Sequence, residues 1–175
     1  MFIAHLPAGY LVARVCIARR PIEISHIRLL VLAGMVGGIF PDIDLIFAAL
    51  SDGPRIHHHR YWPHLPAIWL GLGLLAYSLL RLARARGTRY WPATGIFLLG
   101  VASHLVLDSL VGGIWWLWPW LDQPFALVRI PATYSPWWLN FLLHWSFGVE
   151  LAIVALALAW ESTNPVFFLR KRVYA

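Results

Sequence analysis

The chain has a single cysteine, Cys16, among its 175 residues. One cysteine forms no intrachain disulfide and supports no cysteine-based zinc ribbon. Charged residues are also scarce, at 13%, whereas a typical soluble domain has about 25%. No internal repeat, low-complexity tract or long linker is present, and the length predicts one domain over residues 1–175. These absences argue against a disulfide scaffold and against an ordinary soluble domain.

Apolar residues dominate the sequence instead. They make up 60% of the chain, which includes 11 tryptophans, and the mean hydropathy is +0.67. A bilayer core of about 30 Å needs about 20 helical residues. We therefore predict an all-α, polytopic membrane helix bundle with about five hydrophobic segments, the first of them marginal in length. The segments are residues 2–17, 28–50, 66–82, 92–118 and 137–160.

Basic residues predict the orientation of this bundle. The net charge is +6, and the basic residues cluster beside apolar stretches, which is typical of topology signals and not of a nucleic-acid interface. Placing three clusters in the cytoplasm puts the amino terminus outside and the carboxyl terminus inside. The amino terminus lacks a basic region before its apolar run, so we expect no cleavable signal peptide. The clusters are Arg19, Arg20 and Arg28; Arg81, Arg84, Arg86 and Arg89; and Arg170, Lys171 and Arg172.

Two pairs of ionisable residues lie in or beside the apolar segments. Asp42 and Asp44 follow Pro41, while His104 and Asp108 are four residues apart and share one helix face. Ionisable groups inside a membrane segment are costly and mark functional sites. Two adjacent carboxylates repel unless a cation lies between them. The pairs predict metal ligands; the alternatives are solvated acids at a proline-led turn and a buried hydrogen-bonded pair.

A histidine-rich stretch follows the second segment. It contains His57, His58 and His59, and then His64 after a Trp62-Pro63 bend. Three consecutive rings cannot all point inward, and such a run is often an adventitious metal binder. We expect His59 and His64 to reach the same pocket as the aspartates, because the bend can return His64 to it.

Arg60 lies between the two expected ligands of that stretch. A guanidinium beside metals is suited to hold a phosphate or carboxylate through two parallel hydrogen bonds. We predict that Arg60 contacts an anionic substrate. The alternative is an interfacial arginine paired with Asp52.

Three other histidines differ in what they predict. His5, near the outer start of the first segment, is a further expected ligand. His144 is left open, because a lone histidine on an apolar helix also bonds a neighbouring carbonyl. His26 is excluded because it lies on the predicted cytoplasmic side. All expected ligands then converge on the outer half of the membrane.

The order of these motifs resembles the YdjM-type inner-membrane metal-dependent hydrolases of bacteria. That family is similar in its metal motifs to zinc-dependent phospholipases C and single-strand nucleases, helical proteins that cluster several zinc ions. The resemblance therefore implies phosphoester hydrolysis. The chain has Pro63-His64-Leu65 where the family often has Thr-His-Ser, so it lacks a hydroxyl there. The matches, within residues 1–120, are His5, Pro41 to Asp44, His59 to His64 and His104 to Asp108.

The predicted function is metal-assisted hydrolysis of a phosphoester in a lipid or lipid-linked substrate at the outer face of a bacterial inner membrane. Two or three Zn²⁺ ions, with Mn²⁺ or Fe²⁺ as alternatives, would lower the pKa of a water toward about 7. Asp44 is the expected ligand or proton acceptor, and Arg60 would offset phosphoryl charge. The predicted metal ligands are His5, Asp42, Asp44, His59, His64, His104 and Asp108.

Membrane lipids are the expected partners, and nucleic acid is not. The competing hypothesis is a non-enzymatic membrane metal-binding protein or a divalent-metal transporter. A transporter needs a path through both leaflets, and the inner halves of the segments have few polar residues. A His-Glu-xx-His motif, which an intramembrane metalloprotease would carry on a helix, is absent from the sequence.

Overall fold

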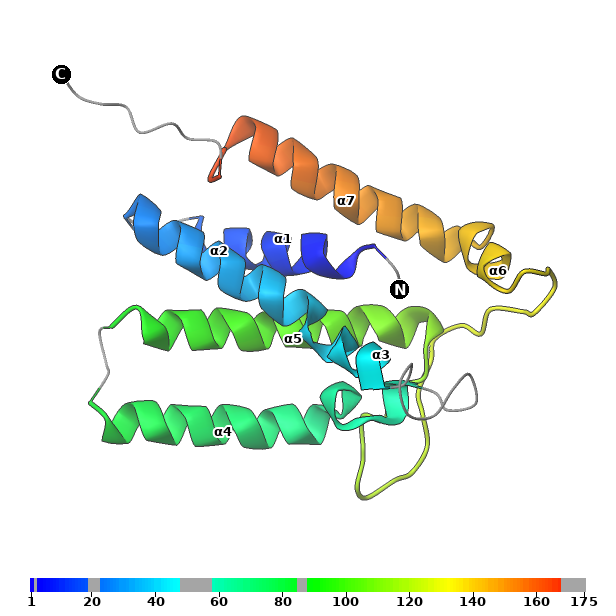
Figure 1. The fold of residues 1–175 in the computed structure, drawn as a ribbon, viewed down its shortest axis with the longest axis horizontal. Helices are drawn as coiled ribbons and strands as arrows, with labels where there is room; N and C mark the ends of the chain where they lie inside the picture. The colour runs from blue at the N-terminus through cyan, green and yellow to red at the C-terminus, as the bar shows by residue number, and fades with distance from the viewer. Residues whose placement is uncertain (2, 19–22, 48–57, 85–87, 168–175) are drawn as a thin grey trace.

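The computed structural model describes residues 1, 3–18, 23–47, 58–84 and 88–167, which form a helical bundle (Figure 1). In these ranges the only extended pairing is an isolated bridge between Ile114 and Phe125, so the prediction of an all-α fold is confirmed there. The longer helices are α1 (His5–Ile17), α2 (Ile24–Ile39), α4 (Pro66–Leu82), α5 (Tyr90–Val111) and α7 (Trp145–Thr163). The shorter ones are η1 (Phe40–Ile43), α3 (Asp44–Phe47), η4 (His58–Arg60), η5 (Trp62–His64) and α6 (Trp138–Leu142).

Three helical stretches of the described chain are long and apolar enough to cross a membrane. They are His26–Ile46, Tyr90–Val111 and Trp145–Thr163. The helices α1 and α4 are also apolar but have only 13 and 17 residues. The structure thus supports a membrane protein with three candidate spans, and it leaves the count of five segments as a prediction.

The ends of the predicted segments differ from the helices. The segment expected over residues 66–82 coincides with α4, but the one expected over 92–118 ends at Val111, because the chain turns at Gly112. The last segment is divided into α6 and α7 at His144, which caps α7. Pro41 ends the regular helix of the second segment, since proline has no N–H to donate. Residues 48–50 of that segment lie outside the described ranges.

Glycines let α1, α2 and α5 approach one another very closely. A Cβ atom at Gly9 would overlap the carbonyl oxygen of Gly34, and one at Gly100 would overlap the same oxygen. A Cβ atom at Gly37 would overlap the carbonyl oxygen of Phe97. Small residues that bring backbones together are typical of helix packing in membranes. These three helices therefore form the centre of the bundle, and α4 and α7 pack at its sides.

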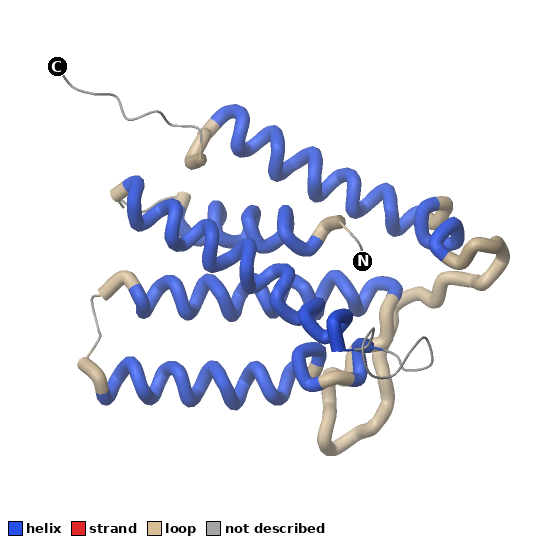
Figure 2. The backbone as a smooth tube through the Cα atoms, viewed as in Figure 1, coloured by secondary structure: helices blue, strands red, loops and turns tan. Residues whose placement is uncertain are grey.

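The bundle has two chemically different ends. The helices α1, α4 and α7 run from one end to the other, and α2 and α5 run back (Figure 2). The starts of α1 and α4, the turn after α2 and the end of α5 therefore meet at one end. The described members of two predicted basic clusters, Arg28, Arg81, Arg84 and Arg89, belong to the opposite ends of their helices.

Candidate metal centre

Four polar side chains from three parts of the chain converge at the end of the bundle opposite Arg28, Arg81, Arg84 and Arg89. Asp42 belongs to the turn η1 after α2, His64 to η5, and His104 and Asp108 to α5. One ligand atom from each lies within 4.8 Å of the others, which is a group that could hold a metal ion. His64, His104 and Asp108 are at most 1% exposed, whereas Asp42 is half-buried.

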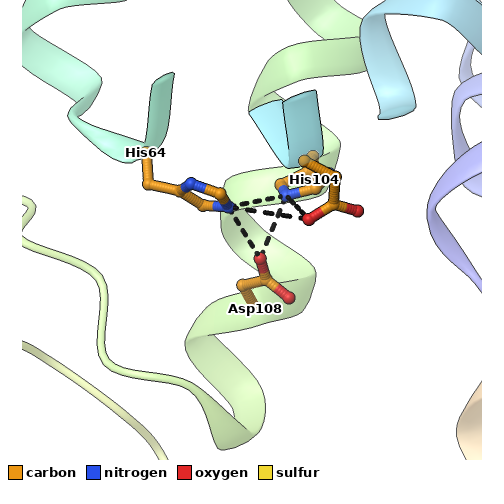
Figure 3. Close-up of side chains that lie close together, drawn as sticks. His64, His104 and Asp108 are labelled. Carbon is orange, nitrogen blue, oxygen red and sulfur yellow. Dashed lines mark hydrogen bonds and ion pairs between the residues drawn. The ribbon is translucent and has the colours of Figure 1, made fainter. Parts of the chain in front are cut away.

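The facing atoms of this group are very close to one another. The Nε2 atoms of His64 and His104 are 3.1 Å apart. Asp108 Oδ2 lies 3.0 Å from the Nε2 atom of His104 and 3.5 Å from that of His64. Figure 3 shows the two imidazoles and the Asp108 carboxylate directed at one common point. Asp42 Oδ1 completes the group at 3.7 Å from His104 Nε2 and 3.9 Å from His64 Nε2.

The outer nitrogens of both imidazoles are already committed to oxygen acceptors. His104 Nδ1 lies 2.7 Å from the carbonyl oxygen of Gly38, which can only accept. His64 Nδ1 lies 2.7 Å from Asp44 Oδ2. Each Nδ1 therefore carries the proton, and each Nε2 presents its lone pair in the neutral ring. This is the arrangement by which proteins orient histidine ligands toward a metal.

Two lone pairs at 3.1 Å repel, so a proton or a metal ion must lie between the Nε2 atoms of His64 and His104. Burial lowers the pKa of His64, but the Asp108 and Asp44 carboxylates outweigh it and raise that pKa to about 9. A metal-free site therefore holds this proton at neutral pH, and a divalent ion would take its place. Nitrogen and carboxylate donors fit zinc and similar transition metals.

Asp108 connects this group to further predicted ligands. Its Oδ2 atom makes no hydrogen bond to any described residue although it is buried, and His59 Nε2 lies 3.4 Å away. Its Oδ1 atom accepts from the α-amino group of Met1 at 2.6 Å and lies 3.2 Å from His5 Nε2. A buried carboxylate oxygen that several imidazole nitrogens approach without a hydrogen bond is suited to a cation.

All seven predicted metal ligands therefore lie in or directly beside one cluster. His5 stacks on His104 with the ring centroids 3.8 Å apart. Asp44, expected as a ligand or proton acceptor, contacts His64 Nδ1 and lies behind that ring instead of belonging to the group of four.

Other predicted residues lie elsewhere. The Arg60 side chain is exposed and pairs with Asp122 at 3.1 Å, so it is bound to a carboxylate and not placed in the cluster. His144 caps α7, and its Nδ1 atom lies 2.9 Å from the hydroxyl of Ser146. His57 and the side chain of His58 lie outside what the structure describes.

Sequence reasoning missed Glu150, a buried residue that supports the cluster from α7. Glu150, in the second turn of α7, is 3% exposed, and its Oε2 atom accepts from the backbone N–H groups of Ile3 and Ala4 at 2.7 and 3.3 Å. It thus satisfies two backbone donors just before α1, where a negative charge is favoured. A carboxylate inside an apolar segment was itself the signal that could have identified Glu150.

The fold and the site define a class of protein, an integral membrane helix bundle with a buried histidine–aspartate cluster. The chain belongs to the YdjM inner membrane protein family, whose model matches residues 1–169. It is similar to the inner membrane protein YbcI of Escherichia coli (strain K12), with 29% identity over 123 residues that cover 61% of this chain and 69% of that protein. No solved structure matches it. Family and relative both indicate an inner membrane protein.

Proposed function

We propose that this protein is a membrane-embedded metal-dependent hydrolase that cleaves a phosphoester of a lipid or lipid-linked substrate. The observation that carries the proposal is the pair of Nε2 atoms of His64 and His104, 3.1 Å apart, with both outer nitrogens committed to oxygen acceptors. A proton on His64 bridges the two Nε2 atoms in the metal-free protein, and a divalent ion in its place would also be bound by the buried Asp108 Oδ2 atom, which has no hydrogen bond to a described residue. The family's inner-membrane description supports a lipid-phase substrate.

The residues of the cluster have separate roles in this proposal. The first ion is held by Asp42, His64, His104 and Asp108. His59 Nε2, 3.4 Å from Asp108 Oδ2, is the donor for a second ion that shares the Asp108 carboxylate. His5 Nε2 lies 3.2 Å from Asp108 Oδ1 and also 3.0 Å from the carbonyl oxygen of Met1, so His5 would have to release that contact before it could bind the same ion. Zn²⁺ is the ion that these donors fit best. Ions of this kind supply Lewis acidity and an activated water.

The chain itself provides the proton acceptor, Asp42, and the buried partners that orient the two imidazoles. Asp42 is the half-buried carboxylate of the group, so it is the one that a solvent-side water can reach. Asp44 is 1% exposed and holds His64 in the required tautomer. The backbone of Gly38 does the same for His104. Such fixed neighbours keep the ligands in place while charge develops on the substrate.

The proposed orientation places this cluster on the periplasmic side. The arginines of α2, α4 and α5 belong to the other end of the bundle, and basic residues are retained in the cytoplasm. A cysteine introduced in residues 122–135 should react with a membrane-impermeant maleimide added to intact spheroplasts. Labelling that appears only after lysis would place the cluster on the cytoplasmic face.

The experiment that tests the function combines metal analysis with a substrate screen. Protein purified in mild detergent should contain Zn²⁺ and should release phosphate, or a phosphorylated headgroup, from one class of membrane phospholipid or lipid pyrophosphate. His104→Ala should abolish both metal content and release. If the fully metallated wild-type protein cleaves none of these substrates, and proteoliposomes containing it transport divalent ions, the transporter hypothesis replaces the enzyme.

A further inference from the structure

A cavity of about 420 Å³ lies against the metal centre at the end of α5. His59 is one of its walls, and the same imidazole lies 3.4 Å from Asp108 Oδ2, so the cavity and the cluster share one side chain. Gly113, just after α5, lines the cavity as well. A Cβ atom there would lie 2.8 Å from the Cβ atom of Pro124, so only a glycine lets the two walls come this close.

Backbone hydrogen bonds build the frame of this cavity. The last carbonyl groups of a helix have no partner within the helix, and here Ser109 and Leu110 accept from the N–H groups of Leu127 and Val128 at 2.8 and 2.9 Å. These bonds fix the backbone directly before Arg129. The segment that leads into Arg129 is therefore hydrogen-bonded to α5, the helix that carries His104 and Asp108.

Asn140 fixes the segment that leads into Phe141, another lining residue of the cavity. Its Oδ1 atom accepts from the N–H groups of Thr133 and Tyr134 at 2.8 and 2.7 Å, and its Nδ2 atom donates to the carbonyl groups of Tyr134 and Trp137. Asn140 is buried. The next residue, Phe141, lines the cavity and contributes an apolar surface.

Arg129 brings a positive charge to this cavity. Its side chain is exposed and lines the cavity. Within the ranges that the structure describes it makes no hydrogen bond or ion pair, whereas Arg60 is paired with Asp122 at 3.1 Å. A guanidinium suits a phosphate because its planar fork can make two parallel hydrogen bonds.

We infer that this cavity is the substrate subsite of the proposed enzyme, and that Arg129, not Arg60, contacts the substrate phosphate. The phosphate would lie between Arg129 and the His59 side of the cluster, while the apolar part of a lipid would lie against Trp115 and Phe141. These aromatic rings share the cavity with Arg129. The inference deepens the proposed function and rests on it, and it assigns the substrate class as a phosphate ester attached to an apolar group.

Binding measured without turnover tests this inference. Zn²⁺-loaded protein in detergent is titrated by calorimetry with two probes, inorganic phosphate and dihexanoyl phosphatidic acid below its micellar concentration. Arg129→Ala should weaken both probes about 10-fold, since it removes charge-assisted hydrogen bonds, and should keep the Zn²⁺ affinity of the wild type. Arg129→Lys should restore part of the loss. Arg89→Ala, an exposed arginine at the other end of α5, is the control and should bind both probes normally.

A second variant separates a lipid headgroup from free phosphate. Phe141→Ala should weaken phosphatidic acid several-fold and leave inorganic phosphate unchanged. Equal binding of both probes to Phe141→Ala and wild type overturns the lipid assignment. Unchanged phosphate binding in Arg129→Ala, or a loss that appears in Arg60→Ala instead, overturns the inference as a whole. A wild-type protein that binds through Arg129 but cleaves no phosphoester defeats the proposed function and leaves this subsite standing.

Discussion

Gly112 offers a way to move one ligand of the cluster without removing it. This residue follows α5, and a Cβ atom added there would overlap His59 Cε1 and lie 2.8 Å from His59 Nδ1. Ordinary contact begins at 3.4 Å, so the ring must shift by about 1 Å to regain a favourable separation. The Gly112 backbone has φ −113°, which any residue adopts, so Gly112→Ala brings no backbone strain.

The size of the effect follows from what His59 contacts. The ring is the end of a side chain that is 16% exposed, so it can move toward the cavity at little cost. Its Nε2 atom would then leave Asp108 Oδ2, now 3.4 Å away. Misplacing a group that holds or orients a metal ligand costs about 10–100-fold in metal affinity, or about 1.4–2.7 kcal/mol. The metal-free protein should unfold at nearly the temperature of the wild type.

Chelator competition for Zn²⁺ and thermal unfolding of the metal-free protein check this prediction together. Gly95→Ala is the matched control, since it adds the same methyl group within α5 where nothing lies within 4 Å. Wild-type Zn²⁺ affinity in Gly112→Ala would show that His59 takes no part in holding metal. A large drop in the unfolding temperature of the metal-free protein would also refute the reasoning. It would mean that the added methyl group displaces the end of α5 and not the His59 ring.

Three further predictions concern the residues around the cluster. Asp44→Asn should weaken Zn²⁺ binding about 10–100-fold in the same competition assay, because the charged partner of His64 Nδ1 is lost. Glu150→Ala should also weaken Zn²⁺ binding, since the backbone before His5 loses its acceptor. Glu161→Ala, which removes the contacts of α7 with Tyr10 and Arg14 of α1, should not. The apparent Zn²⁺ affinity should rise with pH and level off near pH 9, measured by the same competition, because the metal displaces the His64 proton whose pKa is about 9.

The apolar segments could be predicted because hydropathy depends on composition alone. Their ends could not, because these depend on single local contacts. The segment expected to reach residue 118 remains apolar past Val111, but the helix ends at Gly112, where the returning chain takes up the last carbonyl groups of α5. The last segment is interrupted because His144 caps α7 with its own side chain. Neither the end of α5 at Gly112 nor the cap of α7 at His144 is visible in the hydropathy of the sequence.

The grouping of the candidate ligands could be anticipated from helix geometry and orientation. A spacing of four residues places His104 and Asp108 on one face. Because α2 and α5 run in the same direction, the turn after α2 lies at the end of α5. The difference between a residue that faces the candidate metal site and one behind it could not be anticipated. Asp42 and Asp44 are two residues apart, yet one faces the Nε2 atoms and the other holds His64 Nδ1.

The positions of Arg60 and Arg129 show a further limit of sequence reasoning. Arg60 is adjacent in sequence to His59, and this adjacency was the reason to place it beside the metal. In the structure its charge is balanced by Asp122, a residue 62 positions away. Arg129 lines the same cavity as His59 because its segment returns to the end of α5. That proximity comes from tertiary packing and has no local sequence signal.

Gly38 shows why the helix packing and the cluster depend on each other. A Cβ atom on Gly38 would overlap the carbonyl oxygen of His5, so the close approach of α1 and α2 at this point requires glycine. The carbonyl oxygen of Gly38 accepts the Nδ1 proton of His104 at 2.7 Å. Any residue with a side chain would separate α1 from α2 and so displace His5 from the ring of His104 on which it stacks. The small residues that bring the backbones together therefore also set which nitrogen of His104 faces the candidate metal site.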